Sequence, residues 1–268
     1  MRYDISIIIP TYKPKDYLWE CLDSLVKQTF PKKDFEVILV LNGCIEPYKS
    51  AIDKYIAEKM QGMNVNFMHT EVGGVSNARN LALSQINGEY VTFIDDDDYV
   101  SESYLSELFE KASTNIVSIC YPLSFYDNET KYIPYNVTSN YEKNISKNKI
   151  SVLDTKKFFS GPVYKLIHRD VISNIRYDIR LKNGEDTLFM FAISKNIKQV
   201  SLTSKKAIYY RRFREDSAAT KKRLFYDRLK SNSIQICEYM KLYIRAPFKY
   251  NFVFFLTRLG GAFLGIFR

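Results

Sequence analysis

The chain has 268 residues, of which 46% are hydrophobic and 26% charged, and its formal net charge at pH 7 is +9. This composition excludes intrinsic disorder and collagen-like repeats, and a chain of this length can bury a sizeable core. Only two histidines are present, which makes zinc catalysis and histidine-dependent triads unpromising.

Positive charge is concentrated toward the C-terminus. Residues 205–268 contain 15 Lys and Arg against 4 Asp and Glu, whereas the preceding residues are close to neutral. We therefore expect an anionic surface or ligand near the C-terminus. The four cysteines form no CxxC pair, and no run approaches the roughly 20 apolar residues that cross a bilayer, so a cytoplasmic protein is predicted.

Short apolar runs alternate with helical patterns through the first hundred residues. Nearly continuous β-branched runs predict strands that are buried on both faces, and apolar residues at helical spacing follow them. The predicted strands cover residues 5–9, 35–41, 65–69 and 90–94, and the predicted helices cover residues 18–25, 48–59 and 75–86. This alternation is typical of βαβ units in a parallel sheet, whose functional sites lie at the carboxyl ends of the strands.

The pattern weakens beyond residue 100. A strand is predicted at residues 116–121, and helices are predicted at residues 154–159 and 185–195. Residues 122–149 are rich in Asn, Tyr and Lys, which indicates a loop or a hairpin.

Four consecutive carboxylates, Asp95 to Asp98, follow the fourth predicted strand directly. Adjacent carboxylates repel one another, so their clustering at a strand end favours a divalent cation such as Mg²⁺. Such an ion can neutralise a phosphate leaving group. The alternative interpretation is a solvated acidic turn that caps the next helix.

A second acidic pair, Glu185 and Asp186, opens the predicted helix at residues 185–195. A carboxylate there can act as a general base if it reaches an acceptor hydroxyl. It can also simply stabilise the helix N-terminus through the helix dipole.

Two glycines, Gly73 and Gly74, precede the predicted helix at residues 75–86, which carries Arg79 about one turn in. Glycines before a helix are typical of anion-binding helix starts, although the segment matches neither a Walker loop nor GxGxxG. Arg79 can therefore pair with a phosphate or with the acidic cluster, and an ordinary capped loop is the alternative.

These features belong to four short motifs in a fixed order: Pro10-Thr11-Tyr12, Gly74-Val75-Ser76-x-Ala78-Arg79-Asn80, Phe93-Ile94-Asp95-Asp96-Asp97-Asp98 and Gly184-Glu185-Asp186-x-x-Phe189. In type and spacing they resemble the family 2 glycosyltransferases of the GT-A fold over roughly residues 4–215. The resemblance implies a Rossmann-like α/β domain with a mostly parallel central sheet flanked by helices. It places a nucleotide-binding half in residues 1–100, an acceptor-binding half in residues 101–215, and a helical C-terminal extension in residues 216–268.

The resemblance also implies an activity, which is the inverting transfer of a sugar from a nucleotide-diphosphate sugar with Mn²⁺ or Mg²⁺. Asp95 and Asp97 match the DxD motif of the family, with Asp97 as the direct metal ligand and Asp95 nearer the donor ribose and sugar. Asp96 falls in the same donor-binding motif. Asp186 matches the general base that deprotonates the acceptor hydroxyl.

For the nucleotide, the resemblance assigns Pro10, Thr11 and Tyr12 to the base pocket and Arg79 to a position against the nucleotide. Asn42 is a departure, because many members have Asp-Asp-Gly-Ser where this chain has Leu41-Asn42-Gly43-Cys44. An Asn can accept a hydrogen bond from a base but can also donate one. A UDP-sugar is favoured, and a thymidine or guanosine donor stays open.

Four further residues are weaker candidates for the acceptor site or a closing loop. Glu185 adjoins the matched base, and Lys165 lies in a segment that resembles one beneath the acceptor in relatives. Tyr210 and Arg212 belong to residues 209–217, which resemble the mobile loop that follows the catalytic residues in the family.

From residue 239 onward, cations and aromatic residues are interleaved. This composition suits a helix lying on the anionic inner face of the cell membrane, where the resemblance places lipid-linked saccharide acceptors. The alternative is packing within the protein or in a homodimer, and nucleic acid is not expected.

The predicted function is therefore glycosyl transfer to a glycan or lipid-linked hydroxyl in bacterial surface polysaccharide synthesis. Two alternatives remain at this point. One is a sugar-nucleotide nucleotidyltransferase, and the other is a non-catalytic membrane- or RNA-binding module on a degenerate transferase fold.

Overall fold

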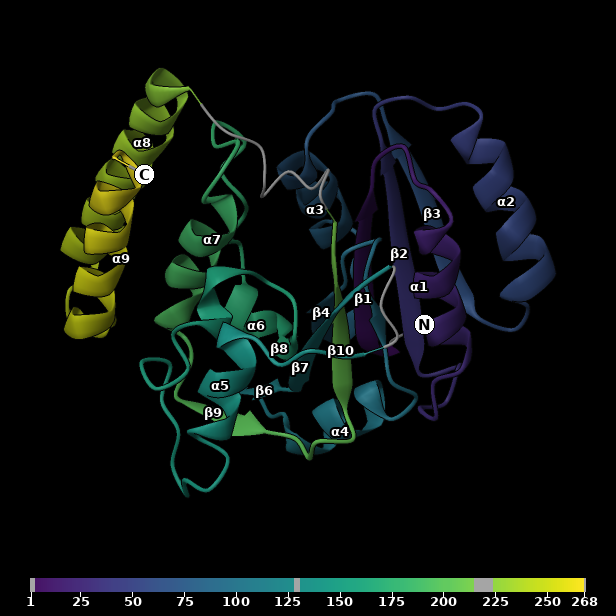
Figure 1. Cartoon of the computed structure of the whole chain (residues 1–268), viewed down its shortest axis with the longest axis horizontal. Coiled ribbons are helices and arrows are strands. Elements are labelled where there is room, and N and C mark those ends of the chain that lie inside the picture. Colours follow the sequence, from purple (N-terminus) through teal and green to yellow (C-terminus); the bar gives the residue numbers. More distant parts are fainter. Residues whose placement is uncertain (1–2, 128–130, 215–223, 268) are drawn as a thin grey trace.

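The computed structural model describes residues 3–127, 131–214 and 224–267. Its centre is a seven-stranded sheet of order β3-β2-β1-β4-β8-β6-β9, which is flanked by helices (Figure 1). Neighbouring strands are parallel except for β8, which runs antiparallel to both β4 and β6. The strands are β1 (Tyr3–Thr11), β2 (Phe35–Asn42), β3 (Asn64–Thr70), β4 (Gly88–Phe93), β6 (Ile116–Ile119), β8 (Lys165–His168) and β9 (Gln199–Leu202).

The N-terminal half confirms the predicted alternation of strands and helices. Its helices are α1 (Tyr17–Val26), α2 (Tyr48–Lys59) and α3 (Val75–Leu83). Every residue of β2 is buried, and so are the apolar residues of β1, because helices cover both faces of a parallel sheet. The carboxyl ends of β1, β2 and β4 therefore meet at one edge.

The predicted strand at residues 116–121 is divided at Cys120. Its first part is β6, whereas its continuation is β7 (Tyr121–Tyr126) in a second sheet of order β5-β10-β7. The other strands of this small sheet are β5 (Tyr99–Val100) and β10 (Ile208–Phe213), and α4 (Tyr104–Lys111) lies between β5 and β6 in the chain. Residues 122–149 were expected to form a loop or hairpin, but they contain most of β7 and also α5 (Asn136–Glu142).

The predicted helix at residues 154–159 is wrong, since only a short 3₁₀ turn, η1 (Phe158–Ser160), forms there. The carbonyl groups of this segment accept hydrogen bonds from one buried and one partly buried cation instead of from the backbone of a helix. Lys165 donates to the carbonyls of Phe158 and Gly161, and Arg258 donates to those of Lys156 and Phe159. A short helix, α6 (Arg169–Ile172), follows β8.

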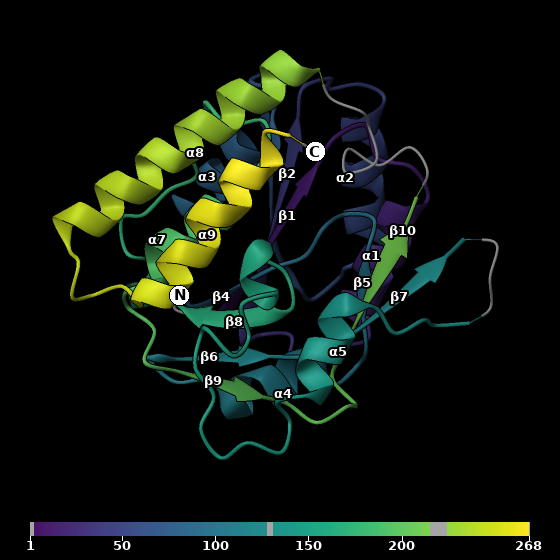
Figure 2. The ribbon, with the colours of Figure 1, turned by 60° about the vertical axis from the view of Figure 1, so that its left-hand side comes forward.

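The helix predicted at residues 185–195 is confirmed as α7 (Glu185–Ser194). Beyond it, α8 (Phe225–Arg245) and α9 (Phe252–Gly265) form a hairpin whose helices lie side by side against α7 (Figures 1 and 2). The ring of Phe191 on α7 is surrounded by rings of the hairpin, with centroids at 5.2 Å for Tyr239, 4.7 Å for Tyr250 and 5.8 Å for Phe254. The C-terminal extension is thus helical, as expected, and it shares the hydrophobic core.

Candidate active site

The sequence-predicted polar residues gather at the carboxyl edge of the main sheet. Thr11 ends β1, Asn42 ends β2, and the acidic run follows β4 directly. The first turns of α3 and α7 bring Arg79 and Asp186 to the same edge. This is where ligands bind in open sheets of parallel strands.

The acidic run forms a compact cluster. Asp95, Asp97 and Asp98 each offer a carboxylate oxygen, and these oxygens lie within 4.8 Å of one another. Thr11 Oγ1 donates a hydrogen bond to Asp96 Oδ2 at 2.5 Å. Burial, reinforced by neighbouring carboxylates, raises the pKa of Asp96 to about 7 and raises the pKa values of Asp97 and Asp98. Carboxylates held together in this way fit a hard divalent cation such as Mg²⁺ or Mn²⁺.

Arg79 connects this cluster to Asp186. Its side chain is 4% exposed, and it donates from Nη1 to Asp186 Oδ1 at 2.5 Å and from Nη2 to Asp95 Oδ1 at 3.0 Å. The guanidinium also lies over the ring of Tyr177 at 5.4 Å. Burial raises the pKa of Asp186 to about 7, although the nearby Arg79 cation acts to lower it. The second acidic pair, about ninety residues further along the chain, is therefore part of the same site as the first.

Strand β10 lines the other side of the acidic cluster. Arg214 Nη2 lies 2.5 Å from Asp97 Oδ2, and the phenol of Tyr209 accepts a hydrogen bond from Asp95 N at 3.1 Å. Arg212 donates from its backbone N–H to Asp98 Oδ1 at 2.7 Å and from Nε to the carbonyl of Asp97 at 2.8 Å. The guanidinium of Arg212 also pairs with Glu20 and Asp127, so its donors are largely engaged. Residues 215–217 of the expected loop lie outside the described residues.

The end of β1 and the loop after β2 form the part of the edge predicted to take the base. Pro10 and Thr11 are buried in β1, whereas Tyr12 is 55% exposed. The ring of Tyr12 lies against Gly43, where a Cβ would come within 2.8 Å of a ring carbon. Asn42 is buried, with its Nδ2 donating to the carbonyl of Thr11 at 2.7 Å and its Oδ1 accepting from Gly74 N at 3.1 Å. Its amide group thus joins the loops after β1 and β3.

Three of the weaker candidates have other surroundings. Lys165 is fully buried in β8, where Nζ donates to three backbone carbonyls and burial lowers the pKa of the ammonium to about 7. Tyr210 stacks on Tyr99 in the small sheet, with 4.7 Å between ring centroids. Glu185 is buried beside Asp186, and its Oε2 has no hydrogen-bond partner among the described residues.

Sequence reasoning did not single out Tyr177, Tyr209 or Arg214. Tyr209 and Arg214 lie within the stretch that was compared with the family loop, but spacing alone did not indicate their partners. Tyr177 stacks on Phe189 of α7 with 4.1 Å between ring centroids, and no motif marks it.

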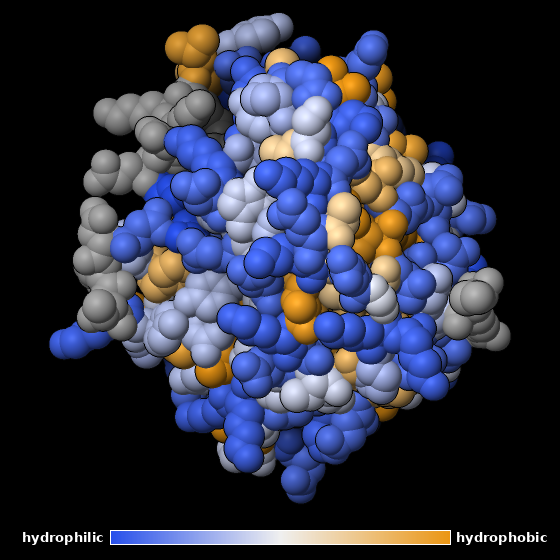
Figure 3. All heavy atoms as spheres, turned by 90° about the vertical axis from the view of Figure 1, so that its right-hand side faces the viewer, coloured by the Kyte–Doolittle hydropathy of each residue, from blue (hydrophilic) through white to orange (hydrophobic). Residues whose placement is uncertain are grey.

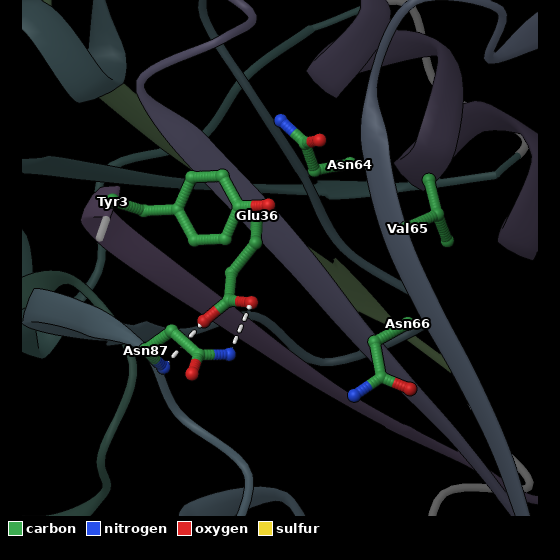
Figure 4. Close-up of a pocket in the computed structure, with 6 residues that line it drawn as sticks. All are labelled: Tyr3, Glu36, Asn64, Val65, Asn66 and Asn87. Carbon is green, nitrogen blue, oxygen red and sulfur yellow. Dashed lines mark hydrogen bonds between the residues drawn. The ribbon is translucent and has the colours of Figure 1, made fainter. Parts of the chain in front are cut away.

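A pocket lies at the opposite edge of the sheet, where its parallel strands begin. It has a volume of about 320 Å³ and is lined by Tyr3, Glu36, Asn64, Val65, Asn66 and Asn87 (Figure 4). The carboxylate of Glu36 accepts hydrogen bonds from Ser6 Oγ, Asn87 N and Asn87 Nδ2. Its hydrogen-bonding capacity is used to join β1 and β2 to the turn before β4, which indicates a structural role.

Comparison with known proteins places this site in context. The sequence model of Glycosyl transferase family 2 matches residues 6–176. Poly(ribitol-phosphate) beta-N-acetylglucosaminyltransferase TarS of Staphylococcus aureus is 27% identical over 215 residues, which cover 78% of this chain and 36% of TarS. Minor teichoic acid biosynthesis protein GgaB of Bacillus subtilis is 32% identical over 232 residues, covering 81% of this chain and 24% of GgaB. The chain thus spans about a third or less of the length of these two relatives.

The crystal structure of S. aureus TarS 1–349 in complex with UDP-GlcNAc has a similar fold. It aligns with a TM-score of 0.71 and 25% sequence identity, covering 91% of this chain and 67% of that chain. The similarity extends beyond the residues that the family model matches and confirms the expected α/β architecture. The chain belongs to Glycosyl transferase family 2.

Proposed function

We propose that this protein transfers a sugar from a nucleotide-diphosphate sugar to a hydroxyl of a glycan or lipid-linked acceptor, with inversion at the anomeric carbon. The observation that carries the proposal is the bridge made by Arg79, which holds a candidate base, Asp186, beside a cluster suited to a divalent cation. Family membership and the likeness to TarS, whose structures contain UDP-GlcNAc and UDP, support it.

The acidic cluster is proposed to hold the donor. Asp97 and Asp95 would bind Mn²⁺ or Mg²⁺, and such an ion supplies positive charge that neutralises a diphosphate leaving group. Asp96 stays in place through its hydrogen bond from Thr11. Pro10, Thr11 and Tyr12 would line the base pocket, with the buried Asn42 fixing the two loops around it.

Asp186 is proposed to be the general base. Its carboxylate accepts the proton of the acceptor hydroxyl while that oxygen bonds to the anomeric carbon from the face opposite the diphosphate. The bond from the anomeric carbon to the diphosphate oxygen breaks, and the nucleoside diphosphate leaves with the electron pair. A pKa near 7 makes this carboxylate more basic than an exposed aspartate and suits it to general-base catalysis near neutral pH.

We infer a UDP-sugar as the donor, because the TarS complexes contain UDP and UDP-GlcNAc. The names of TarS and GgaB associate these two proteins with poly(ribitol phosphate) and with teichoic acid, so the proposed acceptor is a bacterial surface polysaccharide. Residues 1–100 would bind the nucleotide and residues 101–215 the acceptor, with residues 216–268 as the extension. The family match favours glycosyl transfer over nucleotidyl transfer and over a non-catalytic module.

Calorimetric titration tests this proposal directly. The protein is titrated with UDP, TDP, GDP and CDP, each in Mn²⁺ and each in EDTA. We expect binding of UDP in Mn²⁺ only, and we expect Asp97→Asn to abolish it. Asp53→Asn, an exposed change on α2, is the matched control and should bind as the unmodified protein does. Nucleotide affinity that is the same in EDTA, or is unaffected by Asp97→Asn, would contradict the metal assignment.

A further inference from the structure

The outward face of α9 is apolar along its whole length. Phe252, Val253, Leu256, Phe263, Leu264 and Phe267 are all exposed, with values of 57% for Phe263 and 67% for Phe267. Within residues 252–267 there is only one charged residue, Arg258, and it points inward. Its guanidinium donates to the carbonyls of Lys156 at 2.9 Å and Phe159 at 2.8 Å. The helix therefore presents no charge to the outside, and a helix that is apolar on all sides is normally covered.

Exposed apolar residues are also found toward the two ends of α8 and in the turn that joins it to α9. Phe225, Leu229, Met240 and Ile244 are exposed on α8, and Phe248 in the turn is fully exposed. We call this surface, together with the outward face of α9, the hairpin face. Figure 2 shows that α8 and α9 lie side by side in one outer layer of the molecule.

Positive charge borders the hairpin face near the turn. Lys241 and Arg245 lie in the last two turns of α8, and Lys249 lies in the turn. The acidic residue closest in sequence, Glu238, already pairs with Arg180 at 2.8 Å and with Lys241 at 3.0 Å. Among the described residues, neither Arg245 nor Lys249 forms a salt bridge with an acidic side chain. An apolar face with a basic margin is complementary to an anionic, partly apolar partner.

The opposite side of the molecule has a different character. Figure 3 shows that the side nearest α2 is predominantly hydrophilic, with apolar residues scattered over it. On α2 only Ile52 is buried, and its exposed positions include the Lys49–Asp53 ion pair. The side nearest α2 therefore differs from the hairpin face in its exposure of apolar residues. Exposed apolar patches bordered by polar residues mark interaction sites.

We propose that the hairpin face docks on the surface of an anionic lipid bilayer, with its phenylalanine and leucine side chains among the acyl chains and the basic margin over the headgroups. Aromatic and aliphatic side chains on one face with Lys and Arg beside them are the features of interfacial helices. Among the described helices none has both the length and the apolar character to cross a bilayer. The inference does not depend on the proposed glycosyl transfer.

Charge argues against a second copy of the chain as the occupant. A twofold interface pairs a patch with itself, which would bring the basic margins of two hairpin faces close together. The described part of the hairpin offers only Asp227 and Glu238 as acids, and Glu238 is engaged with its own cations. An anionic headgroup layer supplies the missing negative charge.

Vesicle flotation of the full chain tests the proposal. We expect the protein to float with anionic vesicles, which consist of phosphatidylcholine with 30% phosphatidylglycerol. It should float far less with vesicles of pure phosphatidylcholine. Leu256→Glu/Phe263→Glu should weaken flotation more than tenfold, because each change puts a charge into the apolar face. The matched control Val72→Glu/Ile179→Glu replaces two exposed apolar residues elsewhere and should float normally.

A charge variant and a mass measurement complete the test. Arg245→Gln/Lys249→Gln should weaken binding to the anionic vesicles by roughly fivefold per cation and reduce its salt dependence. Circular dichroism melts confirm that each variant folds. Failure of the unmodified protein to float, or equal flotation of Leu256→Glu/Phe263→Glu, overturns the proposal. So does light scattering that finds a dimer in the unmodified protein and a monomer in that variant.

Discussion

Two arginines from different regions of the molecule contact the acidic cluster from opposite sides. Arg79 comes from α3 in the N-terminal half, is almost completely buried and bridges Asp95 and Asp186. Arg214 comes from the end of β10, keeps 27% of its side chain exposed and contacts Asp97 while packing on Tyr17. The first arginine joins two helices of the fold, α3 and α7, whereas the second lies at the border of the described residues.

Because of this difference in exposure, we expect Arg79 to stay in the site permanently and Arg214 to be exchangeable for another cation. A buried guanidinium with two carboxylate partners cannot leave without exposing uncompensated charge. A partly exposed ion pair contributes little free energy and can give way to another cation. Arg79 is therefore expected to organise Asp186, and Arg214 to compete with a divalent ion for Asp97.

The largest expected effect comes from Asp186→Asn, which removes the proposed base but keeps its shape. Turnover should fall by about 10²–10⁴, since this is the contribution of general-base catalysis. Metal-dependent nucleotide binding should be retained, because Asp97 and Asp95 are untouched. Steady-state rates and calorimetry on the same protein check both expectations, and unchanged turnover would mean that Asp186 only stabilises the start of α7.

The next effect concerns Arg79 and the pH profile. Asp186 must be deprotonated to accept a proton, so kcat/KM should fall about tenfold for each pH unit below pH 7 and level off above it.

Arg79→Gln removes a cation that lowers the pKa of Asp186, so the acid limb of this profile should move to higher pH. Stability should also fall by about 3 kcal/mol, as expected when a buried charge loses its partner. Arg79→Lys keeps the charge and should move the acid limb less.

The smallest effect is expected for Arg214→Ala. Removing this cation frees Asp97, so Mn²⁺ in the absence of nucleotide should bind about two- to fivefold more tightly, in line with a partly exposed ion pair. Titration followed by electron paramagnetic resonance measures this affinity. Arg176→Ala is the control and should change nothing, because this exposed arginine donates to the backbone carbonyls of Ser173 and Ile175. Weaker Mn²⁺ binding in Arg214→Ala would contradict the expectation that Arg214 competes with the metal ion for Asp97.

The N-terminal half could be predicted from its sequence because burial on both faces leaves a simple pattern. Residues such as Ile7 and Val37 lie in strands with no polar face, and the helix at residues 48–59 has the predicted bounds. Both levels of information, periodicity and turn signals, point to the same parallel sheet there. Three of the four motifs that indicated the family lie at the ends of these elements, and the fourth opens α7.

The second half was less predictable because tertiary contacts decide its local structure. Nothing in the run at residues 116–121 indicates that the chain passes from one sheet to another at Cys120. The segment at residues 154–159 has helical spacing, but its carbonyls bind Lys165 and Arg258, which come from β8 and α9. Sequence periodicity compares only residues that are close in the chain, so it cannot predict such long-range partners.

For the site, the sequence was a better guide to which residues belong to it than to how those residues pair with one another. Pairing of Arg79 with the acidic cluster was one of the alternatives that the sequence left open, and in the structure Arg79 pairs with Asp95. Its second pairing, with Asp186, was not expected. The roles of Asp97 as a metal ligand and Asp186 as a base stay predictions. The contact of Arg214 with Asp97 could not be inferred, because it depends on the pairing of β10 with β5 and β7.

The cluster of rings around Phe191 has a practical consequence for anyone shortening this protein. Residues 216–268 could be mistaken for a removable tail, since the family model ends at residue 176 and the motifs end earlier than the hairpin. A chain that stopped after residue 215 would leave the ring of Phe191 without Tyr239, Tyr250 and Phe254, on the same helix that carries Asp186. Soluble expression is therefore better sought by changing the outward side chains of the hairpin than by deleting it.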